Sequence, residues 1–275
     1  MAATTQRPGR WYATRTGVRN LIGIESTVTD KDARIDRLIA QMSAHIERRT
    51  DRRFIPVTAT KEFDYQGPSR LILGDDLVAE PTITHANDTL TLAAADILMY
   101  PLNAVDDDEP YLEVAIDESS DYFTYSTIPE SAIAITGRWG YCERKYAATS
   151  LLAESLTADE TAADVDDGTE FAIGMTLLLE SEQVFVRDVV TNTLTLTRGM
   201  NGTTAATHAD DTQVYIVIPP DDIQFSCEVL VARMIHRGDT AWADRVGTPE
   251  QGFTYYRQEP TEVKDILNRY QRLVY

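Results

Sequence analysis

The sequence predicts an α+β fold with a helical-bundle core, a β-hairpin and sheet region, and an inserted all-β module. Three observations support this prediction. Apolar residues recur at helical spacing in 29–56, 219–238 and 261–275. Residues 61–141 instead form short runs of alternating apolar and polar side chains. Residues 150–218 contain no lysine and are rich in Thr, Ala, Asp and Gly, which indicates a separate insertion.

These observations divide the chain into three parts. Residues 1–20 are expected to be a basic N-terminal arm, because they contain four arginines and no acid. The arm is either a disordered tail or a segment that docks on an acidic partner through Trp11 and Tyr12. Residues 21–149 and 219–275 are expected to form the core domain, and 150–218 the inserted β module.

The first predicted helix lies within 29–56. Thr29 or Asp30 is its expected N-cap, and Pro56 is expected to prevent its continuation. Its apolar stripe, at spacings of three and four, is Ile35, Leu38, Ile39, Met42 and Ile46. Its far end carries Arg48, Arg49, Arg52 and Arg53. The residues alone predict a core helix, and its basic end is either solvated or used in a contact.

The β-rich region has turn signals between its apolar runs. Strands are expected around Phe63 and Tyr65, around 71–73, and at 98–102, 111–116 and 132–139, with a tight hairpin at Asn87-Asp88. One loop carries four consecutive acids, Asp106, Asp107, Asp108 and Glu109. These acids lack the spacing of a calcium loop, so a solvated loop is the preferred interpretation over a metal site.

The inserted module and the C-terminal region have distinct patterns. Short strands separated by Asp-Gly, Thr-Asn-Thr and Gly-Met-Asn-Gly turns fill 150–218. His208 with Asp210 and Asp211 lacks a second His or Cys at ligand spacing, so no metal site is assigned there. A helix is expected after Pro219-Pro220, with Gly238 as its C-cap. The last predicted helix, 261–275, has a wide apolar face, part of which is expected to meet another chain.

Composition and motifs exclude several functional classes. The net charge of -19 argues against wrapping of nucleic acid. Neither a signal peptide nor an apolar run of spanning length is recognisable, so synthesis in a cytoplasm is expected. Two cysteines are too few for a disulfide framework. We find no nucleophile with its base, no phosphate loop and no dinucleotide-binding glycine pattern. The sequence therefore predicts no enzyme, with no catalytic, cofactor-binding or metal-binding residues.

Five segments in fixed order carry a family resemblance. They are D-A-R-I-D-R-L-I-A-Q-M-S-A-H-I-E-R-R-T-D-R-R-F-I-P, an aromatic strand with Phe63 and Tyr65, L-I-L-G-D-D-L-V, A-I-A-I-T-G-R-W-G-Y and P-P-D-D-I-Q-F-S-C-E-V-L-V-A-R-M. This order resembles the head-tail connector (adaptor) proteins of tailed bacteriophages over about 30–141 and 219–250. The insertion at 150–218 departs from the simple adaptor pattern and resembles a small β module of phage structural proteins.

The resemblance implies a structural virion protein of the neck or tail, made in the host cytoplasm. In that family a helical bundle with β loops assembles as a ring, usually of twelve copies, beneath the portal protein. DNA passes through the ring without specific binding. The expected partners are the portal protein, tail or nozzle proteins and, through the inserted module, tail fibres. No contact with a membrane is expected.

Residues are assigned to contacts on this basis. The candidates for portal contact are Arg7, Arg10, Arg15, Tyr270, Leu273 and Val274. The candidates for contact between subunits are Arg48, Arg49, Arg52 and Arg53. The acidic loop Asp106, Asp107, Asp108 and Glu109 is a candidate for channel lining or tail contact. An alternative from another class is a β-rich fibre or carbohydrate-binding tail component whose active part is the module.

Overall fold

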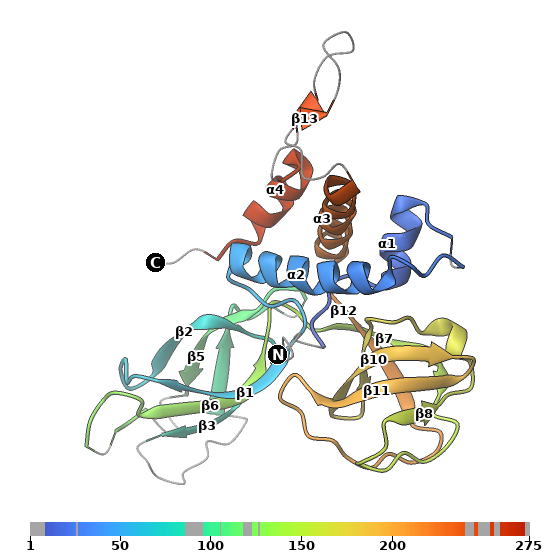
Figure 1. The fold of residues 1–275 in the computed structure, drawn as a ribbon. Helices are drawn as coiled ribbons and strands as arrows, with labels where there is room; N and C mark the ends of the chain where they lie inside the picture. The colour runs from blue at the N-terminus through green and yellow to red at the C-terminus, as the bar shows by residue number, and fades with distance from the viewer. Residues whose placement is uncertain are drawn as a thin grey trace. The chain divides into compact units, whose positions relative to one another are not determined.

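The computed structural model describes residues 9–25, 27–85, 96–104, 106–117, 123–125, 127–239, 245–246, 254–255 and 259–272. Over these residues the protein is α+β, with four α-helices and two antiparallel six-stranded sheets (Figure 1). The chain forms two compact units. The first contains the described parts of Met1–Asp51, Lys145–Met200 and Thr204–Arg272, and the second those of Arg52–Arg144 and Asn201–Thr203. The domain boundaries predicted at 149 and 219 stay a prediction.

The four α-helices of the described residues belong to the first unit. They are α1 (Arg15–Ile22), α2 (Asp32–Thr50), α3 (Asp221–Asp239) and α4 (Thr261–Arg269). Helix α3 packs against each of the other three (Figure 1). Its buried residues are Ile223, Ser226, Cys227, Leu230, Val231 and Ile235. None of the helices in the described part of the chain is long and apolar enough to span a membrane.

Helix α2 confirms the predicted apolar stripe but ends earlier than expected. Ile35, Ile39 and Ile46 are fully buried, as the spacing predicts. The helix ends at Thr50 because Asp51 adopts a left-handed conformation with φ of 54°. The backbone N–H of Arg272 then donates to the Thr50 carbonyl over 2.9 Å, which satisfies one of the open carbonyls at the helix end. Pro56 is therefore not what stops this helix.

The other helix ends also differ from the predictions. Lys31 occupies the N-cap position of α2 without a side-chain hydrogen bond, in place of Thr29 or Asp30. Helix α3 continues through Gly238 to Asp239, so Gly238 is not its C-cap. Helix α4 ends at Arg269, short of residue 275, and buries Val263 and Leu267.

The N-terminal segment joins α2 to the β module within the first unit. The Tyr12 backbone N–H donates to Ser43 of α2 over 3.0 Å, and the Tyr12 hydroxyl donates to Glu47 over 2.9 Å. On the other side, the Trp11 ring meets the Phe185 ring edge to face, with centroids 5.1 Å apart. From Gly9 onward the structure thus differs from the expected arm, because Trp11 and Tyr12 are buried within their own chain.

The β module of the first unit is one antiparallel sheet with the strand order β7-β12-β9-β10-β11-β8. Its strands are β7 (Arg144–Leu151), β8 (Ala162–Asp164), β9 (Thr176–Leu179), β10 (Glu182–Val190), β11 (Thr193–Met200) and β12 (Gln213–Ile218). A 3₁₀ turn, η2 (Gly168–Glu170), lies between β8 and β9. Alternate residues such as Val184, Val186, Leu194 and Leu196 point into one apolar core, as their period of two predicts.

The second unit contains the other sheet, with the strand order β1-β6-β2-β5-β4 and β3 also paired to β6. Its strands are β1 (Val57–Phe63), β2 (Arg70–Leu77), β3 (Thr82–His85), β4 (Ile97–Tyr100), β5 (Tyr111–Ile116) and β6 (Ile133–Trp139). Trp139 is fully buried in its core and donates to the carbonyl of Ala59 over 2.9 Å. The hairpin predicted at Asn87-Asp88 lies outside the described residues. A short pair, β13 (Arg245–Val246) and β14 (Thr254–Tyr255), belongs to the first unit.

Candidate protein-docking site

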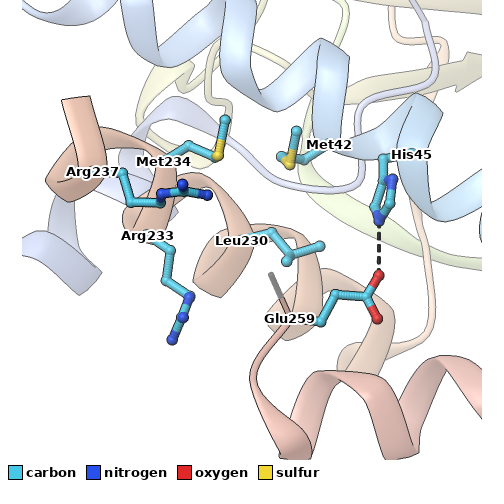
Figure 2. A pocket seen from close by; sticks show the side chains of 7 residues that line it. All are labelled: Met42, His45, Leu230, Arg233, Met234, Arg237 and Glu259. Atoms are coloured by element: carbon cyan, nitrogen blue, oxygen red, sulfur yellow. Dashed lines mark hydrogen bonds and ion pairs between the residues drawn. The ribbon is translucent and has the colours of Figure 1, made fainter. Parts of the chain in front are cut away.

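A cleft of about 260 Å³ opens in the first unit between α2, α3 and Glu259, which lies two residues before α4 (Figure 2). We call it the methionine cleft, and its lining is Met42, His45, Leu230, Arg233, Met234, Arg237 and Glu259. Figure 2 shows its arrangement: Arg233 and Arg237 stand on one side, the His45–Glu259 pair stands on the other, and the apolar side chains lie between them.

Helical periodicity brings these side chains together. Arg233, Met234 and Arg237 come three, four and seven residues after Leu230 on α3, so the four side chains share one face. The two helices are joined beside the cleft by Arg34 of α2. This side chain donates to the carbonyls of Met234, over 3.4 Å, and Ile235, over 3.0 Å. The arginine thereby fixes the C-terminal half of α3 against α2.

The chemistry of the cleft suits a protein side chain. Its volume lies below the roughly 300–1,000 Å³ of typical small-molecule sites. Methionine side chains adapt to the shape of an apolar partner, and arginine at the rim favours carboxylates. His45 Nε2 lies 3.0 Å from Glu259 Oε1, which ties the start of α4 to α2. The arrangement can therefore accept an apolar side chain that is accompanied by acidic groups.

The four arginines predicted to make subunit contacts lie in different surroundings. Arg48 is exposed on α2. Arg49 donates to Gln271 over 3.1 Å and to Asn268 over 2.5 Å, which links the end of α2 to the end of α4. Arg52 forms an ion pair with Asp76 at 2.8 Å inside the second unit, where the Asp76 side chain is fully buried. Arg53 is partly buried, and its carbonyl accepts from Tyr141 over 2.7 Å. Two of the four guanidinium groups thus have internal partners.

The candidates for portal contact are also partly engaged within the chain. Arg10 lies 3.5 Å from Glu47, and Arg15 pairs with both Asp36 and Asp32. The hydrogen bond with Asp36 raises the pKa of Arg15. The Tyr270 hydroxyl donates to Asp222 over 2.9 Å. The remaining candidates, Arg7, Leu273 and Val274, lie outside the described residues.

The acidic loop forms a compact turn on the surface of the second unit. Asp106, Asp107, Asp108 and Glu109 are all exposed. Backbone hydrogen bonds shape the turn: Asp106 and Asp107 donate to Asn103, and Glu109 donates to Ala104. Leu102, in the same turn, has 69% of its surface exposed, the largest fraction among the described large apolar residues. The turn therefore presents a leucine together with four carboxylates.

A buried polar network in the β module involves His208, with partners other than those weighed from the sequence. Its Nδ1 lies 2.8 Å from Glu180 and its Nε2 lies 2.9 Å from Glu182, whereas Asp210 and Asp211 do not contact it. Glu182 also accepts two bonds from Arg198, at 2.8 and 2.7 Å, and backbone bonds from 199 and 206. Among the described residues no group of three or more His, Cys, Asp or Glu is arranged to hold a metal ion.

Opposing effects set the pKa of Glu182. Burial alone would raise it, but the hydrogen bonds from Arg198 and His208, with two from backbone N–H groups, lower the pKa to about 2. Both ring nitrogens of His208 lie within hydrogen-bonding distance of carboxylates. The network joins β10 and β11 to the loop at 156–160, because Arg198 also donates to the carbonyls of Thr157 and Glu160.

Sequence reasoning did not find the methionine cleft or helix α1. Met42 was recognised only as a member of the first helix's apolar stripe, because nothing in the sequence indicates that this helix pairs with the one that carries Met234. Helix α1 had a readable signal that was not used. Thr14 accepts from the Gly17 N–H as an N-cap, and Gly23, with φ of 68°, ends the helix.

The comparisons with known proteins identify no family. No protein-family model matches the chain, and no curated protein matches it significantly.

Proposed function

We propose that the protein is a structural, non-enzymatic component of a tailed-bacteriophage virion: a head-tail connector (adaptor) ring that docks beneath the portal and joins it to the tail. In this proposal the fold consists of a helical-bundle core and a β-hairpin and sheet region, and residues 150–218 are an inserted all-β module. The protein is made in the host cytoplasm and resides in the neck or tail of the virion.

The order of the elements carries the proposal. Helix α2, the strands β1 to β6, the β module and helix α3 follow one another in the chain. Apart from the module, this is the order of the segments that resemble the connector family. Each segment alone is common, so the support comes from their succession over about 30–141 and 219–250.

The charge distribution supports assembly into a ring. A ring of identical subunits needs two different, complementary surfaces on each subunit. The chain carries a net charge of -19 but has local basic positions at Arg48, Arg233 and Arg237. An acidic channel wall would leave DNA mobile, because affinity for phosphates depends on Lys and Arg.

The proposed partners are the portal protein, tail or nozzle proteins and further copies of this chain, and the family resemblance implies a ring of twelve copies. Tail fibres are the proposed partner of the module. Arg48 is the candidate subunit contact with the most exposed position among the four arginines. The Trp11 ring packs against Phe185 of the module, so a deletion of residues 150–218 would also expose Trp11 to solvent.

Portal binding tests the proposal. The purified chain is mixed with the portal protein of the same virus, and the mixture is examined by analytical ultracentrifugation. We expect a species heavier than the portal ring that contains multiple copies of this chain. The Arg48→Glu variant should bind with a lower stoichiometry while its thermal unfolding stays unchanged. If the two proteins sediment independently at micromolar concentrations, the connector proposal is wrong.

A further inference from the structure

We infer that the methionine cleft of one subunit receives the acidic turn of a second copy of this chain. This turn, here called the acidic knob, comprises residues 101–104 and 106–109. The inference rests on the proposed ring function and specifies one contact within it. Its basis is the match in chemistry between a concave and a convex surface of the same chain.

The acidic knob has the features of an inserted group. Leu102 is 69% exposed, and transfer of its apolar surface from water into an apolar cleft is favourable. The backbone bonds from Asp106 and Asp107 to Asn103 hold the turn in one conformation. A turn that is already ordered loses little conformational entropy when it binds.

The cleft has the complementary features. Its apolar centre, formed by Met42, Leu230 and Met234, suits one leucine side chain. Arg233 and Arg237 line one side of the cleft (Figure 2), and guanidinium groups form strong hydrogen bonds with carboxylates such as those of the acidic knob. Opposite charges at such a contact guide association and fix its register.

The contact is heterologous, because the knob and the cleft are different surfaces. Each subunit uses its cleft for one neighbour and its knob for the other. Such contacts close into a ring when the rotation between neighbours permits, and otherwise continue as a filament. A symmetric dimer would need the same surface on both sides, which this pairing does not provide.

A charge swap tests the contact. The full chain is assembled with the portal, and the oligomer is sized by native mass spectrometry. We expect Arg233→Glu and Asp107→Arg each to raise the concentration for half-assembly by about tenfold or more, since each places like charges together. The double variant should recover most of the assembly. Leu102→Ser should weaken assembly as well, whereas Ile128→Ser, at another exposed apolar position (58%), should not.

A cross-link gives an independent measurement that does not depend on the charge variants. Both native cysteines, Cys142 and Cys227, are buried, so the chain offers a low thiol background. A chain that carries Leu102→Cys and Met234→Cys should form a ladder of covalent oligomers on oxidation, and each single variant should not. Normal ring assembly by both charge variants, together with no ladder, would overturn the inference and leave the connector proposal intact. Absence of any ring in the wild-type protein would refute both.

Discussion

The Glu182 network predicts a specific loss of stability in acid. The perturbation is Glu182→Gln, which keeps the size of the side chain and removes its charge. The carboxylate has a pKa of about 2 in the folded protein and 4.5 as its ordinary value. One pKa unit corresponds to about 1.36 kcal/mol, so the charged form contributes about 3 kcal/mol to folding at neutral pH. The side chain is fully buried, so solvent screening reduces this figure little.

The sign of the effect fixes the pH window. A carboxylate with a lowered folded pKa stabilises the protein above its unfolded pKa, and this contribution is lost as the pH falls from about 4.5 towards 2. Urea unfolding of the full chain should therefore show Glu182→Gln to be about 3 kcal/mol less stable than the wild type at pH 7. The difference should shrink progressively below pH 4.5.

A matched control separates this effect from the many other acids of the chain. Glu154 lies in the same module but is exposed, so Glu154→Gln should leave the free energy of unfolding within about 0.5 kcal/mol of the wild type at every pH. If the deficit of Glu182→Gln were the same at pH 7 and pH 3, the lost interaction would not be the charge of Glu182, and the reasoning would be refuted.

Three further predictions concern buried groups. Trp11→Ala should lower the free energy of unfolding by about 3–5 kcal/mol in urea titrations, because the buried indole packs on Phe185. An equally large loss in the control Tyr146→Ala, at an exposed position, would contradict this. Asp76→Ala should lower the free energy of unfolding by about 3–5 kcal/mol in the same assay, because the variant leaves Arg52 without its buried carboxylate. A loss under about 1 kcal/mol would mean that this ion pair contributes little to stability. Burial raises the pKa of Cys227 to about 12. This thiol should therefore not react with a disulfide reagent at pH 8 until the protein is unfolded. Rapid reaction of Cys227 in the native protein would disprove its burial.

The sequence predicted those elements whose pattern is local. The stripe of α2 repeats over several turns, and its members Ile35, Ile39 and Ile46 are fully buried in the structure. Alternation likewise located β10 and β11. The end of α2 was misplaced because Pro56 is a visible stop signal, while the left-handed conformation of Asp51 depends on a single residue with only a weak preference for it.

The candidate site needed information that is not local. Met42 and Met234 meet only because α2 packs on α3, and sequence spacing does not specify that pairing. His208 reaches Glu182 through the folding of the loop after β11, so its neighbours in sequence, Asp210 and Asp211, do not identify its partners. The arm was misjudged for a similar reason, because Trp11 packs against Phe185, which lies 174 residues later in the chain.

Direct imaging of the virus particle is the most decisive test of the connector proposal. A reconstruction of the particle neck by electron cryomicroscopy should contain a ring of copies of this chain immediately below the portal, with the channel for DNA along its axis. Both six-stranded sheets and the four helices of the described residues should fit the density of each copy. Finding the chain only in the tail fibres, or finding no copy at the neck, would contradict the proposal.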